Sequence, residues 1–119
     1  MEQINAKITI TNQNEKQETK TKTNITDDKI WYIENDVYRT LSIYNLKEDT
    51  LERDNEELYL KYKFIKDKYT KNLLEIKSLN KKTNIEIFTK NIYKTNNFVK
   101  ITYIIDDCEF IYEIKILSD

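Results

Sequence analysis

The C-terminal third of the chain alternates apolar and polar residues with few interruptions. The alternation covers residues 85–87, 98–105 and 110–116. Successive side chains on a β-strand point to opposite faces, so this period of two predicts half-buried antiparallel strands joined by short turns. The pattern indicates a small β-rich domain.

The N-terminal part continues the same pattern with more polar residues. Residues 13–24 are polar, but their threonines alternate with charged residues, which predicts a solvated strand; low-complexity disorder is the alternative. Residues 29–33 and 37–44 flank a compact turn at 34–36 and predict an aromatic-rich hairpin. The first strand has four residues on one face: Ile4, Ala6, Ile8 and Ile10.

Residues 50–79 fit two periods. One set follows helical spacing and predicts a long amphipathic helix: Leu51, Leu58, Tyr62, Ile65, Tyr69, Leu73 and Ile76. Alternatively, residues 58–64 alternate as a strand, Asp67 falls in a turn, and residues 69–76 return as a second strand. Periodicity alone leaves both structures open.

The order of elements resembles the YwiB-like family of uncharacterised bacterial proteins, which has a calycin-like, lipocalin-type β-barrel. The matching segments are residues 6–10, 28–38, 84–92, 99–105 and 109–117. The chain departs from the family in having no glycine in the turn before residues 88–90. The resemblance implies an all-β fold in one domain over residues 1–119, an antiparallel barrel of roughly eight to ten strands with 58–64 as strand. The alternative is an α+β fold with a helix over 50–79.

Composition narrows the possible chemistry. The chain has 119 residues, enough for one domain, and contains no histidine, glycine or proline. The absence of histidine excludes Ser-His-Asp and Cys-His catalysis and most zinc sites, and the absence of glycine excludes glycine-rich phosphate loops. We therefore expect no metal and no cofactor, and interpret Asp106, Asp107 and Glu109 as a hairpin turn.

The residue usage, rich in Ile, Lys, Asn and Tyr, is typical of an AT-rich bacterial genome. Without glycine, we expect asparagine to occupy the turns. The expected turn positions are Asn12, Asn14, Asn35, Asn45, Asn80, Asn91, Asn96 and Asn97.

The location is expected to be the cytoplasm. Cys108 is the single cysteine and cannot form an intramolecular disulfide, and no apolar h-region follows the first residues. No apolar run approaches the roughly 20 residues that a membrane-spanning helix needs, and the mean hydropathy is -0.77. We expect a soluble protein without a membrane partner, and the sequence leaves its oligomeric state open.

Three functions follow from these features. The first is a non-enzymatic barrel whose interior is either packed shut or holds a small, largely apolar ligand, with aromatic contacts from Trp31, Tyr38, Tyr62 and Tyr103. The second is a nucleic-acid-binding or protein-inhibitor module that uses Lys61, Lys63, Lys66, Lys68, Tyr69 and Lys71. A sequence pI of about 5.6 argues against a dedicated nucleic-acid binder. The third is a carboxylate-based enzyme, which needs an interior Asp or Glu with a raised pKa.

The alternation also predicts the core. The residues expected to be largely buried are Ile8, Ile10, Leu60, Tyr62, Ile87, Ile101, Tyr103, Tyr112 and Ile114.

Overall fold

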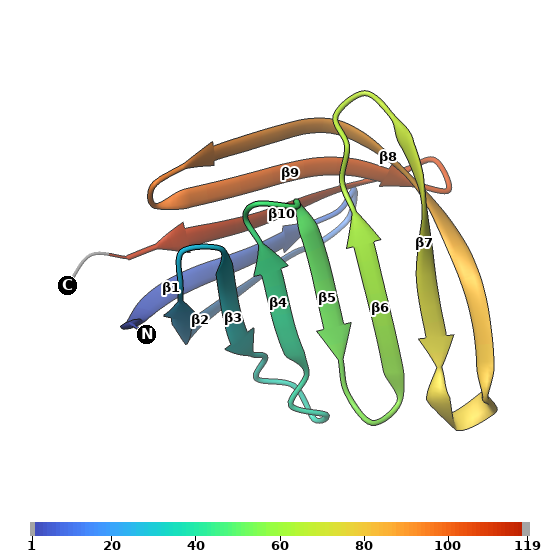
Figure 1. Ribbon diagram of the computed structural model, residues 1–119, viewed down its shortest axis with the longest axis horizontal. Coiled ribbons are helices and arrows are strands. Elements are labelled where there is room, and N and C mark those ends of the chain that lie inside the picture. Colours follow the sequence, from blue (N-terminus) through green and yellow to red (C-terminus); the bar gives the residue numbers. More distant parts are fainter. Residues whose placement is uncertain (1, 118–119) are drawn as a thin grey trace.

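The computed structural model describes residues 2–117, which form a closed antiparallel barrel (Figure 1). Each strand pairs with its neighbours in sequence, and β1 pairs with β10 to close the barrel. The strands are β1 (Glu2–Thr11), β2 (Lys16–Ile25), β3 (Lys29–Ile33), β4 (Leu41–Asn45), β5 (Thr50–Asp54), β6 (Leu58–Lys63), β7 (Tyr69–Ile76), β8 (Lys81–Thr95), β9 (Phe98–Ile105) and β10 (Cys108–Ile116). A short 3-10 turn, η1 (Lys77–Leu79), precedes β8.

The barrel is flattened into two layers whose strands cross. In Figure 1, β3 to β7 run nearly upright, while β8, β9, β10 and β1 run across them. β8 belongs to both layers, since it pairs with β7 over its first half and with β9 over its second. The register shifts between Thr89 and Asn91, and such a bulge lets a strand bend around a barrel corner.

Residues 50–79 contain strands, as the resemblance implies, and the helix alternative is wrong. Residues 58–61 of β6 pair with residues 73–76 of β7 around a turn that contains Asp67, whose φ is 63°. A helix would have buried Ile65, Tyr69 and Leu73, but these side chains are 40%, 68% and 37% exposed. The alternation with a period of two, and not the helical spacing, therefore predicted the structure of this segment correctly.

The N-terminal hairpins differ in how well the sequence predicted them. β2 pairs with β1 along its whole length, so the strand interpretation of the polar segment is confirmed and the disorder alternative is wrong. The strand predicted at 37–44 begins later, at Leu41. The Asp36 carboxylate accepts hydrogen bonds from the Thr40 N–H and hydroxyl (3.0 and 2.7 Å), and these bonds hold residues 37–40 in a loop.

Aspartate, more than asparagine, takes the backbone positions that glycine usually occupies. Positive φ angles occur at Arg39, Asp49, Asp67, Asn80, Asp106 and Asp107. The Asp106–Asp107 turn is confirmed, whereas Asn91 lies within β8 and was wrongly assigned to a turn. Asn12 acts through its side chain, since its Oδ1 accepts from the N–H groups of Asn14 and Glu15 (both 3.0 Å).

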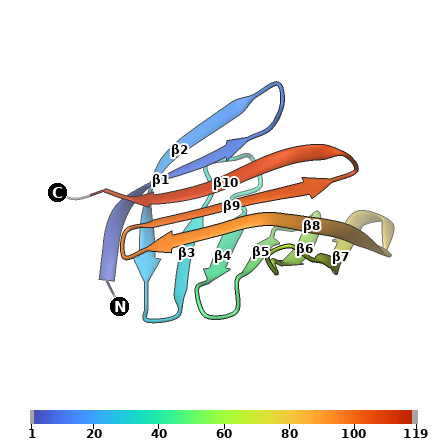
Figure 2. The same cartoon turned by 90° about the horizontal axis from the view of Figure 1, so that it is seen from above.

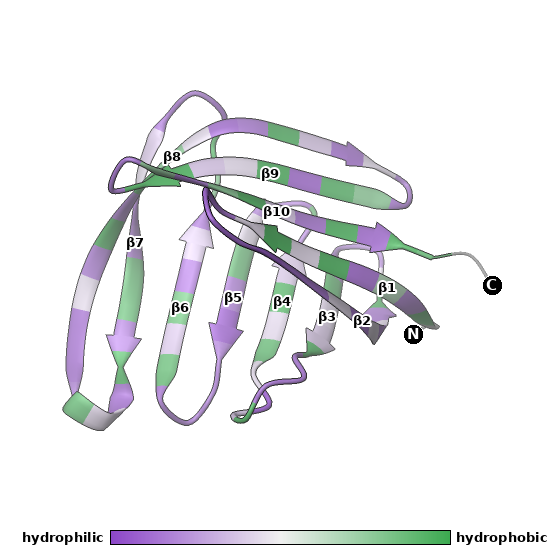
Figure 3. Ribbon diagram, turned by 180° about the vertical axis from the view of Figure 1, so that it is seen from behind, coloured by the Kyte–Doolittle hydropathy of each residue, from purple (hydrophilic) through white to green (hydrophobic). Residues whose placement is uncertain are grey.

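The core follows the predicted faces, and apolar and polar residues alternate along the strands (Figure 3). Seven of the nine expected residues are buried, while Ile10 and Tyr62 are half-buried and pack against the core. Three large side chains that were not on that list, Tyr32, Tyr44 and Phe64, are also buried. No helix within residues 2–117 is long and apolar enough to span a membrane.

Replacement of a central core residue should be costly. Ile101 and Ile114 are fully buried, so Ile101→Ala or Ile114→Ala should lower the free energy of unfolding by roughly 2–5 kcal/mol through lost burial and a cavity. Urea denaturation measures this loss. Val37→Ala is the control, since Val37 is 88% exposed. A loss below about 0.5 kcal/mol at both core positions would contradict the assigned inner face.

Candidate functional site

A half-buried ion pair lies on the inner face of the barrel wall. Leu51 is buried, and Arg53, two residues later on β5, points to the same inner side. The Arg53 guanidinium donates from Nε and Nη2 to the two Glu34 carboxylate oxygens (2.8 and 2.9 Å). The Ser42 hydroxyl donates to the same carboxylate (2.6 Å). This bidentate geometry fixes both charged side chains at the inner wall.

Tyrosine side chains surround this ion pair. The Tyr32 and Tyr112 hydroxyls share a buried hydrogen bond of 2.6 Å that joins β3 to β10. The Tyr62 and Tyr103 ring centroids lie 6.3 Å apart, and Tyr103 stacks on Phe110 at 5.5 Å. Burial raises the pKa of both Tyr62 and Tyr103, and the positive charge of Arg53 opposes this rise in each case. The guanidinium therefore lies close enough to act on both hydroxyls.

Three polar groups of this cluster have no protein partner. Within residues 2–117, no hydrogen bond is found for Arg53 Nη1 or for the hydroxyls of Tyr62 and Tyr103. Thr89 Oγ1 is the one fully enclosed side-chain N or O atom without a partner in the same residues, so the three groups remain accessible. Aromatic rings surround these groups: Phe110 stacks on Tyr103, and Phe64 packs on both Tyr62 and Tyr103. We call this polar floor with its apolar wall the barrel mouth.

A second polar cluster links the β4–β5 turn to β8. Asp49 Oδ1 accepts from the Tyr44 hydroxyl (2.9 Å) and from Lys94 Nζ (2.8 Å), and Lys94 also bonds the Leu46 carbonyl (3.0 Å). Burial raises the pKa of Tyr44 far above its ordinary value, and the Asp49 charge adds to that rise. Asp49 therefore links β4 to β8 through the Tyr44 hydroxyl and the Lys94 ammonium group.

The four predicted ligand contacts separate into two groups. Tyr62 and Tyr103 lie together in the barrel mouth. Trp31 lies on the outer face of β3, because its neighbours Ile30 and Tyr32 are buried on the inner face. Tyr38 lies in the loop before β4 and is 47% exposed.

Sequence reasoning missed the ion pair of Arg53, Glu34 and Ser42. Arg53 stands within a segment rich in acidic residues, and it was not among the predicted site residues. The spacing of two residues between Leu51 and Arg53 could have revealed it. On a strand this spacing puts Arg53 on the same apolar face as Leu51, and a charged residue on that face needs a partner.

The lysines of the nucleic-acid alternative lie outside the barrel. Lys61, Lys63 and Lys71 line a shallow groove over β5, β6 and β7, and Lys66 and Lys68 lie in the loop between β6 and β7. Tyr69 packs on Phe88 with a centroid distance of 4.9 Å and remains mostly exposed. Lys61 Nζ lies 3.9 Å from the Glu52 carboxylate, whereas Lys63 Nζ donates to the main-chain carbonyl of Glu48, whose side chain lines the same groove.

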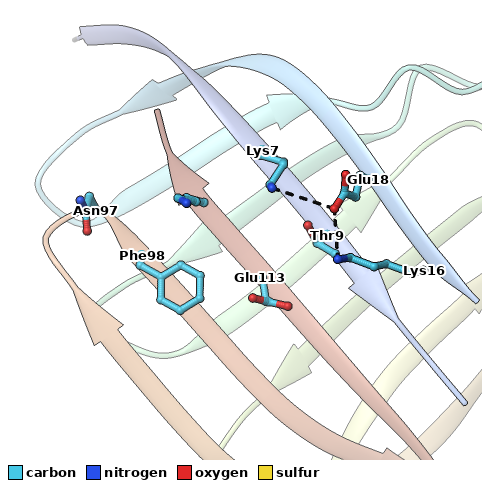
Figure 4. Close-up of a pocket in the computed structure, with 8 residues that line it drawn as sticks. Lys7, Thr9, Lys16, Glu18, Asn97, Phe98 and Glu113 are labelled. Atoms are coloured by element: carbon cyan, nitrogen blue, oxygen red, sulfur yellow. Dashed lines mark ion pairs between the residues drawn. The ribbon is translucent and has the colours of Figure 1, made fainter. Parts of the chain in front are cut away.

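A second outer cavity, of about 400 Å³, lies over β9, β10, β1 and β2 (Figure 4). Its lining includes Lys7, Lys16 and Lys115, but also Glu18 and Glu113. Glu18 Oε1 lies 3.2 Å from Lys16 Nζ and 3.9 Å from Lys7 Nζ. These ammonium groups, with Lys16 foremost, lower the pKa of Glu18. The lining carries both positive and negative side chains, so it does not form a site for a ligand of one charge.

Metal ligands do not converge in the part of the chain that the structure describes. No group of three or more Cys, Asp or Glu side chains there could hold a metal ion. Glu109, one of the acidic residues near the β9–β10 turn, pairs instead with Lys90 (2.6 Å).

Comparison with solved structures identifies the fold. The chain is similar to the crystal structure of the YwiB protein from Bacillus subtilis, with a TM-score of 0.62. The match covers 98% of this chain and 91% of that chain, at 13% sequence identity. The barrel thus has the YwiB fold. At this identity the likeness concerns the fold alone, and it confirms the resemblance seen in the sequence at that level. No family model and no curated protein matches the sequence.

The buried tyrosine pair predicts loss of stability at alkaline pH. Burial raises the pKa of Tyr32 to about 12 and holds that of Tyr112 well above its ordinary value, whereas an unfolded tyrosine titrates near 10. Above about pH 10 the unfolded chain releases these protons first, so stability falls as the pH rises towards the folded pKa values. Urea midpoints at about pH 8 and about pH 11 should show this loss.

The variant Tyr32→Phe/Tyr112→Phe should reduce that alkaline loss by about 1–3 kcal/mol, because both titrating hydroxyls are absent. Tyr93→Phe is the control, since Tyr93 is 52% exposed. An unchanged alkaline loss in the double variant would show that the pair does not govern it.

Proposed function

We propose that this protein is a non-enzymatic binding protein that holds a small, largely apolar ligand in the barrel mouth. One observation carries the proposal: Arg53 Nη1 and the hydroxyls of Tyr62 and Tyr103, which have no hydrogen-bond partner within residues 2–117, lie among aromatic rings that include Phe110. A few placed polar groups within an apolar lining are typical of small-molecule sites.

The charges of Arg53 and Glu34 determine whether the polar group of the ligand should be charged or neutral. Glu34 binds Arg53 through both carboxylate oxygens, so the two charges compensate each other. A ligand carboxylate would face the Glu34 charge, whereas an uncharged carbonyl or hydroxyl oxygen can accept from Arg53 and the tyrosines without that repulsion. We therefore favour an apolar molecule with one uncharged oxygen group.

The enzymatic alternative has less support. Glu34 is the carboxylate that projects into the barrel mouth, and its oxygens accept bonds from Arg53 and Ser42. A general acid or base must instead have a free oxygen within reach of the substrate. The site therefore favours binding over carboxylate catalysis.

The nucleic-acid alternative rests on Tyr69, Phe88 and the lysines around them. Glu48 and Glu52 lie beside these lysines and oppose a polyanion, so this proposal stands second. Retention on single-stranded DNA that falls steeply with salt would favour it. We assign the protein to the cytoplasm, because Cys108 is an exposed free thiol and suits a reducing compartment.

Removal of the two free hydroxyls should weaken ligand binding. Octan-1-ol should displace an uncharged polarity-sensitive dye such as Nile red from the wild-type protein more effectively than octanoate or octylammonium does. Tyr62→Phe/Tyr103→Phe should weaken octanol binding roughly tenfold, because two hydrogen bonds are lost. The melting temperature should hold, since neither hydroxyl has a protein partner. Dye fluorescence measures the affinity.

Tyr93→Phe is the matched control, because it removes a hydroxyl from an exposed ring outside the barrel mouth. Absence of dye binding by the wild-type protein would contradict the proposed function. Equal octanol affinity in the double variant would contradict the assigned site.

A further inference from the structure

The barrel is weakly closed between β2 and β3. β2 has ten residues, but only Asn24 and Ile25 pair with β3, opposite Trp31 and Ile30. The next bonded pair would join Lys22 to Ile33, and the ladder ends before it. Figure 2 shows the β1–β2 hairpin diverging from the other strands. Residues 16–23 of β2 therefore form a strand edge.

The register fixes which backbone groups point to this edge. The β1–β2 turn closes with the Asn12 N–H donating to the Glu15 carbonyl (2.9 Å), and bonded pairs alternate from there. The pairs that bond β1 are Ile10 with Gln17, Ile8 with Thr19, Ala6 with Thr21, and Ile4 with Thr23. The N–H and C=O groups of Glu18, Lys20 and Lys22 consequently point away from β1, and no backbone partner for them occurs among the described residues.

Elsewhere the barrel satisfies such groups. β6 and β7 also diverge beyond Lys61, but the Lys63 N–H donates to Asn72 Oδ1 (2.7 Å) and the Lys63 carbonyl accepts from the Thr70 hydroxyl (2.7 Å). At the β2 edge the one recorded bond is a long contact from the Thr21 hydroxyl to the Lys22 carbonyl (3.4 Å). Side chains therefore satisfy the backbone groups between β6 and β7 and leave those of the β2 edge free for pairing.

We propose that the β2 edge binds an extended acidic segment of a partner protein as an added antiparallel strand. Residues opposite Lys20 and Lys22 would share their outer face, so acidic side chains there would pair with two exposed ammonium groups. Thr19 and Thr21 lie on the inner face with Ile8 and Ala6, so the alternate residues of the partner would be β-branched.

Charge favours this occupant over a second copy of the chain. The outer face of the edge carries Lys16, Lys20 and Lys22 against Glu18 alone, and Glu18 is already held by Lys7 and Lys16 (Figure 4). Two such edges would bring an excess of positive charge together, which is how edge lysines oppose self-pairing. An acidic strand meets attraction at the same positions.

Two variants of one residue test the proposal. A fluorescein-labelled eight-residue peptide that alternates glutamate with valine should bind the wild-type protein, measured by anisotropy, and one that alternates lysine with valine should not. Lys20→Thr keeps the edge N–H and should weaken binding several-fold with a smaller salt dependence. Lys20→Pro removes an N–H that β1 does not use and should weaken binding at least tenfold beyond Lys20→Thr.

A second measurement does not depend on the folding of the proline variant. Peptide binding should slow hydrogen exchange at the Lys20 and Lys22 amides of the wild-type protein and leave the Thr19 and Thr21 amides unchanged, because β1 already binds these. The proposal is overturned if the acidic peptide does not bind, if Lys20→Pro and Lys20→Thr bind equally, or if the protein alone dimerises through this edge.

Discussion

Closure of the barrel depends on the pairing of the first strand with the last. Residues 6–11 of β1 pair with residues 111–116 of β10, so segments more than 100 residues apart in the chain form one ladder. Without this ladder both strands would be edges with unpaired backbone groups, and the inner faces of both layers would lose their cover. The core residues Ile8, Tyr112 and Ile114 lie on these two strands, so closure and burial are one event.

Polar groups inside the barrel make the interior specific. Arg53 and Glu34 are partly removed from water, and their mutual attraction offsets this cost because the geometry is bidentate and Ser42 adds a bond. The ion pair joins the end of β3 to β5, and the Tyr32–Tyr112 bond joins β3 to β10. An apolar interior excludes a one-residue slip but keeps its faces after a shift of two residues, whereas these bonds form in one register only.

The sequence predicted strand identity better than it predicted the site. Period-two alternation marks a face, so the burial of Ile8, Ile101 and Ile114 followed directly. Trp31 and Tyr32 show what that rule demands: neighbours on a strand cannot share a face, and Trp31 is accordingly outside. The ion pair between Glu34 and Arg53 spans 19 residues and three strands. No local pattern encodes such a contact, because it depends on how the strands are arranged in space.

Within residues 2–117, side chains bind the free backbone groups where β6 and β7 diverge, but not where β2 and β3 diverge. This difference distinguishes the β2 edge from the rest of the barrel wall. Asn72 and Thr70 hydrogen-bond to the backbone N–H and carbonyl of Lys63. The Asp49 carboxylate accepts hydrogen bonds from Tyr44 and Lys94. Ordinary polar residues such as Asn, Thr and Asp are therefore sufficient to satisfy free backbone and side-chain groups. The β2 edge ends beside β3, the strand that carries Tyr32 and leads to Glu34 in the barrel mouth. The backbone groups of Glu18, Lys20 and Lys22 thus remain available to external groups in the part of the chain that the structure describes.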